Sequence, residues 1–100
     1  MIRQEADGRL RVEAPMTLAN ARLLLQAGQT ALQAALQAGQ KTCTLELSGV
    51  VSVDSSGLAV LLDWQRFCRA RGARLYVAGA PENLRLLADL YDLNPLLEWA

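Results

Sequence analysis

The chain has 100 residues, of which 52% are hydrophobic. This length suits one domain over residues 1–100 with a single core, and it is too short for a second lobe. Ten basic and ten acidic residues give a formal net charge of zero. The chain therefore lacks the overall field that attracts proteins to nucleic acids or anionic lipid surfaces, and we expect neither as a direct partner.

The first half of the chain alternates between strand and helix patterns. Segment 9–14 alternates apolar and charged residues, which predicts a half-buried strand. Helical spacing follows over 21–39, where Gly39 is placed to end the helix. Segments 42–47 and 50–53 again carry strand signals. The apolar positions of the helix at 21–39 are Leu25, Leu32, Ala35 and Leu36.

The second half predicts two more helices with a strand between them. The first helix covers 58–71 and ends at Gly72, the strand covers 73–79, and Pro81 is suited to open the next helix. The expected buried positions are Val60, Leu61, Trp64, Phe67 and Cys68 in the first helix, and Leu84, Leu87, Ala88 and Tyr91 in the second. Strands alternating with helices predict an α/β fold, with four or five strands in a parallel or mixed sheet and helices covering one face.

Two surface patterns each have two interpretations. Neutral glutamines recur along the helix at 21–39. They form either a solvent-exposed face or a surface that packs on a partner without much charge to desolvate. They are Gln26, Gln29, Gln33, Gln37 and Gln40. Four arginines near the end of the helix at 58–71 either complement the helix dipole or form a patch for an acidic partner. They are Arg66, Arg69, Arg71 and Arg74.

The sequence argues against catalysis. The chain contains no histidine, and Lys41 is its only lysine, so a serine nucleophile has no evident base. The glycine-rich phosphate-binding motifs are absent. Cys43 and Cys68 match no metal-ligand spacing, and we expect them to be buried thiols in a reducing compartment. We therefore expect no enzyme activity, no cofactor and no metal.

The stretch Asp54-Ser55-Ser56-Gly57 lies where a strand leads into a helix. A helix cap accounts for one polar residue, Asp54 or Ser55, but not for three followed by glycine. The position also places the loop at the C-terminal edge of a sheet, where open α/β folds bind ligands. Two functions remain open: a serine that becomes phosphorylated as a binding switch, or an unmodified docking surface for a partner protein.

The residues "LSGVVSVDSSGLAVLL", a glycine before the next strand and a leucine-rich helix after it resemble the STAS domain. The resemblance covers about residues 9–97 and implies the STAS fold. Two branches of that family fit. Anti-sigma-factor antagonists carry a phosphoacceptor serine next to the glycine, which maps onto Ser56, and they bind a kinase that also sequesters a sigma factor.

The second branch, MlaB, is similar to the later half of the chain, particularly in "LRLLADLYDL". This resemblance, which we favour, implies a non-catalytic subunit of an ABC-type phospholipid transporter that maintains outer-membrane lipid asymmetry. It would bind the MlaF-like ATPase subunit, support its assembly and activity, and reach the permease through it without binding lipid. Ser55 maps onto the ATPase contact.

The expected docking surface has a centre and a rim. Its centre is Asp54, Ser55, Ser56, Gly57 and Leu58, and its rim is Asn20 and Arg22. We expect a cytoplasmic protein held at the inner membrane by its complex, since the N-terminus is polar and no apolar run approaches the roughly 20 residues of a membrane span. Trp64 is expected in the core, while Trp99 is either a lid on the tail or an anchor for a partner.

Overall fold

Four strands form one sheet in the order β1-β2-β3-β4 in the computed structural model, which describes residues 1–100. The strands are β1 (Ile2–Gln4), β2 (Arg9–Val12), β3 (Thr42–Glu46) and β4 (Arg74–Ala78). Strand β1 pairs with β2 in antiparallel orientation, and the other two pairs are parallel. The predicted α/β fold with a mixed sheet of four or five strands is confirmed.

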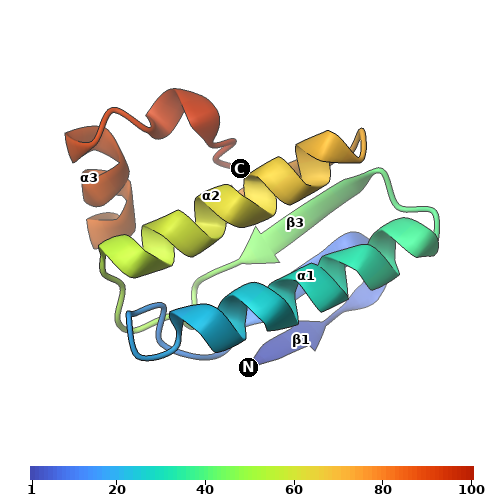
Figure 1. Cartoon of the computed structure of the whole chain (residues 1–100), viewed down its shortest axis with the longest axis horizontal. Coiled ribbons are helices and arrows are strands. Elements are labelled where there is room, and N and C mark those ends of the chain that lie inside the picture. The colour runs from blue at the N-terminus through green and yellow to red at the C-terminus, as the bar shows by residue number, and fades with distance from the viewer.

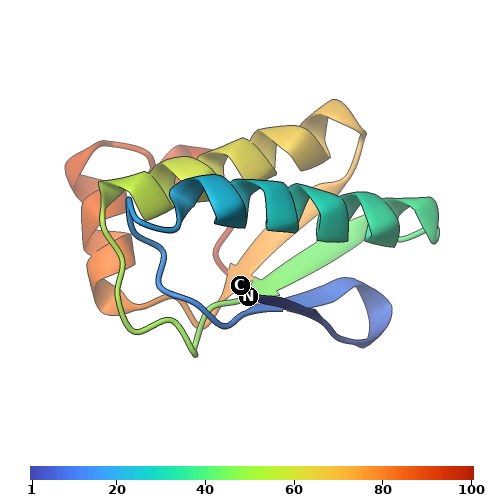
Figure 2. The ribbon, with the colours of Figure 1, turned by 60° about the horizontal axis from the view of Figure 1, so that its bottom comes forward.

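Two long helices cover one face of the sheet. Helices α1 (Ala21–Gln37) and α2 (Ser55–Ala70) lie side by side on that face, and α3 (Glu82–Leu90) lies at the end of the sheet beside the start of α2 (Figures 1 and 2). Two short 3-10 helices, η1 (Ala6–Gly8) and η2 (Asn94–Leu96), complete the elements. The predicted arrangement of helices on one face is therefore correct.

The core lies between the sheet and these helices. Alternate strand residues point toward the helices because successive side chains of a strand face opposite sides. The inward side chains of β2, β3 and β4 are Leu10, Val12, Cys43, Leu45, Leu75 and Val77, each no more than 1% exposed. Val60, Leu61, Trp64 and Cys68 of α2 are buried as predicted, whereas Phe67, also predicted in the core, is half-buried.

Sequence patterning missed β1, which has three residues and only one apolar side chain, that of Ile2. It pairs with β2 through a hairpin whose turn includes Asp7 (φ 59°) and Gly8 (φ 79°), both left-handed. Asp-Gly is a recognised hairpin signal, so this turn was the available clue. The hydrogen bond from the Glu5 amide to the Arg9 carbonyl, 2.8 Å, closes the hairpin.

Two other predictions about local structure are wrong. Segment 50–53 is not a strand, because the chain turns at Ser48 and Gly49 and leaves the sheet, retaining only an isolated bridge between Val53 and Met16. Tyr91 is 52% exposed, because the short helix α3 buries only Leu84 and Ala88 against the rest of the protein.

The C-terminal segment closes the outer edge of β4. Val77 of that strand donates its amide to the Glu98 carbonyl and accepts the Ala100 amide, both at 2.8 Å. Trp99 is half-buried, and its Nε1 donates to Asn94 Oδ1 at 2.9 Å. Trp99 therefore helps to hold the C-terminal segment against the rest of the protein. None of the helices is long and apolar enough to cross a bilayer.

Candidate functional site

Asp54 organises the start of α2. Its Oδ1 accepts hydrogen bonds from the amides of Ser56 (2.8 Å) and Gly57 (3.3 Å), and its Oδ2 accepts one from the amide of Leu18 (3.1 Å). The bonds from Ser56 and Gly57 satisfy free amides of the first turn of α2, and the bond from Leu18 ties this turn to the loop before α1. The bond to Leu18, with those to Gly57 and Ser56, holds the pKa of the Asp54 carboxyl below its ordinary value. Asp54 is therefore the helix cap, and α2 begins three residues earlier than the sequence predicted.

The loop before α2 is held against the loop before α1. The Met16 amide donates to the Ser52 carbonyl at 2.9 Å, and the Asp54 amide donates to the Met16 carbonyl at 3.2 Å. A side chain at Gly57 would overlap the Met16 backbone, so glycine allows the close approach of these two segments. The sequence indicated a close approach at Gly57, and the structure shows that the approaching backbone belongs to the same chain.

The two serines differ in exposure. Ser55 and Ser56 occupy the first turn of α2; Ser55 is exposed, whereas Ser56 is half-buried. Neither hydroxyl is hydrogen-bonded within the chain. Leu58 is only 2% exposed, so its prediction as part of the docking surface is wrong: it points from the first turn into the core. Gly57 is buried as well.

The predicted rim residues have separate environments. The Asn20 side chain is half-buried and donates to the Pro15 carbonyl at 2.9 Å, which stabilises the loop that carries Leu18. Arg22 is exposed on the first turn of α1 and forms no hydrogen bond or ion pair. Asn20 therefore has a structural role beside the site, and Arg22 is free to meet a partner.

A groove of about 430 Å³ begins at Ser55 and runs along α3. On the α2 side it is lined by Val53, Asp54 and Ser55, and on the α3 side by Asn83, Leu86, Leu87, Leu90 and Tyr91. The side-chain Nδ2 of Asn83 donates a hydrogen bond to the Val53 carbonyl at 3.1 Å and connects the two sides of the groove. Leu86 and Leu90 are 61% and 72% exposed. The sequence prediction missed this apolar wall because helical spacing defined only the buried face of α3 and assigned no role to Leu86 and Leu90.

The four arginines do not form one patch. Arg66 pairs with Asp63 (2.6 Å), and Arg74 pairs with Glu98 (2.7 Å). Arg71 stacks on the Phe67 ring, 3.6 Å from its centroid, and Arg69 reaches the Leu96 carbonyl at 3.5 Å. Each guanidinium is engaged within the chain, which argues against the acidic-partner interpretation. No three His, Cys, Asp or Glu side chains lie together as metal ligands would.

Solved structures with the same fold include anti-sigma factor antagonists. A candidate antagonist from Thermotoga maritima is 19% identical to this chain with a TM-score of 0.72, and the alignment covers 99% of this chain and 83% of the antagonist. Unphosphorylated SpoIIAA is 14% identical (TM-score 0.68), covering 100% and 86% respectively. Phosphorylated SpoIIAA from Bacillus is 16% identical (TM-score 0.67), covering 100% and 89%. These likenesses establish a shared fold.

A family model identifies the family of this chain. A model described as "Mlab, STAS domain" matches residues 2–98, and the chain belongs to that family. A comparison with curated protein sequences finds no match.

Proposed function

We propose that this chain is the non-catalytic cytoplasmic STAS subunit of an ABC-type phospholipid transporter, and that it docks on the ATPase subunit through the groove between Ser55 and α3. The observation that carries the proposal is the exposed apolar wall beside the capped start of α2, in a chain of the MlaB STAS family. An exposed apolar patch rimmed by polar residues is typical of a protein interaction site.

The geometry of the groove suits a rigid docking surface. Asp54, Asn20 and Asn83 direct their polar atoms to backbone groups of the same chain, so the loops are already ordered before a partner binds. A preordered surface loses less conformational entropy on binding. A partner helix with apolar side chains would contact Leu86 and Leu90 while a polar group reaches the free Ser55 hydroxyl.

The subunit would act on the ATPase by population shift. An ATPase changes the arrangement of its domains during its cycle, and a small protein that binds one arrangement more tightly favours it. The STAS domain needs no chemistry of its own for this role.

The experiment is affinity purification from native cells with identification of the bound chains, comparing wild type with Ser55→Arg and Leu90→Arg. Both positions are exposed, so the fold should persist while binding of the ATPase falls. Ala70→Arg is the matched control, because it adds the same charge at the far end of α2. Full recovery of the ATPase by both groove variants would contradict the proposal.

The alternative is a phosphorylation-controlled anti-sigma-factor antagonist, in which Ser56 was the predicted phosphoacceptor. A free serine hydroxyl at a helix N-terminus favours it, because the helix dipole stabilises added negative charge there. Exposure favours Ser55 over Ser56 as the serine a kinase would reach. Mass spectrometry of the purified protein separates the functions: a phosphate on either serine with a bound kinase supports the antagonist, and an unmodified chain with a bound ATPase supports the transporter subunit.

A further inference from the structure

One edge of the sheet is open. The outer edge of β4 is covered by the C-terminal segment, but no chain segment lies beside the outer edge of β1 (Figure 2). Toward β2, the Met1 carbonyl accepts the Glu13 amide and the Glu5 amide donates to the Arg9 carbonyl, both at 2.8 Å. Because neighbouring residues of a strand direct their backbone groups to opposite edges, those of Ile2 and Gln4 face outward without partners.

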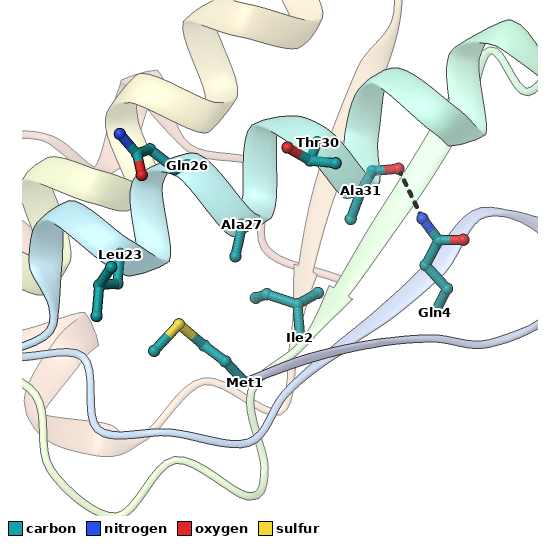
Figure 3. A pocket seen from close by; sticks show the side chains of 8 residues that line it. All are labelled: Met1, Ile2, Gln4, Leu23, Gln26, Ala27, Thr30 and Ala31. Atoms are coloured by element: carbon teal, nitrogen blue, oxygen red, sulfur yellow. Dashed lines mark hydrogen bonds between the residues drawn. The ribbon is translucent and has the colours of Figure 1, made fainter.

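A groove of about 710 Å³ opens beside this edge, between β1 and α1. Figure 3 shows Leu23 and Ala27 projecting from α1 toward Met1 and Ile2, and the Gln4 side chain donating to the Ala31 carbonyl at 3.2 Å. Leu23 is 59% exposed and Met1 is 45% exposed. The groove thus leaves apolar side chains in water directly next to unpaired backbone groups.

Beyond Arg22 in its first turn, the helix above the groove carries no charge. No charged residue occurs from Leu23 to Gln40, in a chain whose residues are 20% charged. The outward side chains beside the groove are instead neutral or small, as in Gln26 and Thr30. Such a face meets an identical face without charge repulsion, and glutamine amides both donate and accept hydrogen bonds. This neutrality favours a second copy of the chain over a charged partner.

The charges on β1 select one way to pair two copies. Arg3 and Glu5 lie on the same face of the strand because they are two residues apart. A two-fold axis through Gln4 places Arg3 of each copy opposite Glu5 of the other. An axis through Arg3 would instead place two arginines opposite each other, which is destabilising, and an axis through Ile2 would form no charge pair.

We propose that the open edge of β1 and the adjoining face of α1 bind a second copy of this chain, with the two β1 strands antiparallel about an axis at Gln4. The two sheets then become continuous, and the two α1 helices, which lie on the same side, face each other across the grooves. Each copy contributes only the three-residue strand β1 and one face of α1, so we expect the dimer to be weak and concentration-dependent. This surface is separate from the groove at Ser55, so the dimer does not depend on the proposed function.

Sedimentation equilibrium of the purified chain over a range of concentrations tests the proposal. Wild type should pass from monomer to dimer as concentration rises. Thr30→Arg should weaken the dimer about tenfold or more, because it introduces like charges between the two helices. Thr30 is exposed, so the fold should persist, and Ala70→Arg on α2 is the control that should dimerise like wild type. A wild type that stays monomeric up to about 1 mM overturns the proposal, as does a dimer unaffected by Thr30→Arg.

A charge exchange tests the two-fold axis. Glu5→Arg and Arg3→Glu should each weaken the dimer, and the double variant should restore it, because the opposite charges face each other again. Arg3 also pairs with Glu13 at 3.2 Å, but this exposed pair contributes little to folding. Circular dichroism confirms that each variant is folded. A double variant as weak as the single ones excludes the axis at Gln4.

Discussion

Gly28 of α1 lies directly against the indole of Trp64 in α2, and a side chain at position 28 would overlap that ring. The Trp64 Nε1 donates to the Leu25 carbonyl, one turn before Gly28, at 3.2 Å. The absence of a side chain thus lets the two helices share a fully buried tryptophan whose polar atom is satisfied. This contact sets how closely α1 and α2 pack against each other.

Gly28→Ala should destabilise the protein, although alanine is the better helix former by about 1 kcal/mol. Overpacking a core costs about 1–3 kcal/mol or more, and here the methyl group would meet a rigid ring. Urea unfolding followed by Trp fluorescence measures the loss. Gln33→Ala at an exposed position of the same helix is the control and should stay near the wild-type midpoint. An alanine variant as stable as wild type would show that the two helices can separate at little cost.

Asp54→Asn should reduce the dependence of stability on acid. The folded-state pKa of Asp54 is depressed below the ordinary value of 3.8, so its contribution is complete above that value and is lost as pH falls through the folded pKa. Asparagine still caps the helix but does not titrate, so the variant should fold at neutral pH and lose less stability as the pH falls below the ordinary pKa of 3.8. Thermal unfolding at several pH values measures how steeply the stability of wild type and of the variant falls with pH. The same dependence in both proteins would contradict a depressed pKa at Asp54.

The thiols should be inert in the folded protein and should lower its stability in alkali. Burial raises the pKa of Cys43, and burial with the charge of nearby Cys43 raises that of Cys68 to about 12. Both thiols therefore stay neutral in the folded state at a pH where the unfolded chain has ionised them, so unfolding becomes more favourable above about pH 9.

Ellman's reagent at pH 8 should label neither thiol until denaturant is added, because the thiolate is the reactive form and both residues are buried. Urea midpoints at pH 8 and pH 10 measure the stability effect. The double variant with alanine at Cys43 and Cys68 should lose less stability between the two pH values. Rapid labelling of the native protein would mean that the core opens readily.

Trp99→Ala should loosen the C-terminal segment from β4. Trp99 bonds to Asn94 and lies under the Arg85 guanidinium, 4.9 Å from the ring centroid. Without these contacts, the hydrogen bond from the Val77 amide to Glu98 should open more often, and hydrogen exchange at Val77 should accelerate about tenfold or more. The Leu45 amide in the central strand β3 is the internal control. An unchanged exchange rate at Val77 would mean that the ion pair between Arg74 and Glu98, and not Trp99, keeps the C-terminal segment on β4.

Periodicity predicted β2, α1, β3, α2, β4 and α3 because each has the spacing of its own element and a polar or glycine residue near its end. The cap before α2 was also accessible, since it depends on Asp54 and the residues next to it. Strand β1 was not, because three residues are too few for a pattern and its pairing depends on β2. Segment 50–53 has the β-branched composition of a strand but pairs with a neighbour only at the isolated bridge between Val53 and Met16.

The site divides in the same way. The sequence by itself determined that Asp54, Ser55 and Ser56 stand at the start of a helix, because capping is a local interaction among adjacent residues. Only the tertiary structure decided that Leu58 enters the core while Leu86 and Leu90 stay in water. Helical spacing identifies an apolar face, but how much of that face is covered depends on which distant elements pack against it. For α3, that coverage ends at Leu84 and Ala88, and the remaining apolar surface forms the wall of the groove.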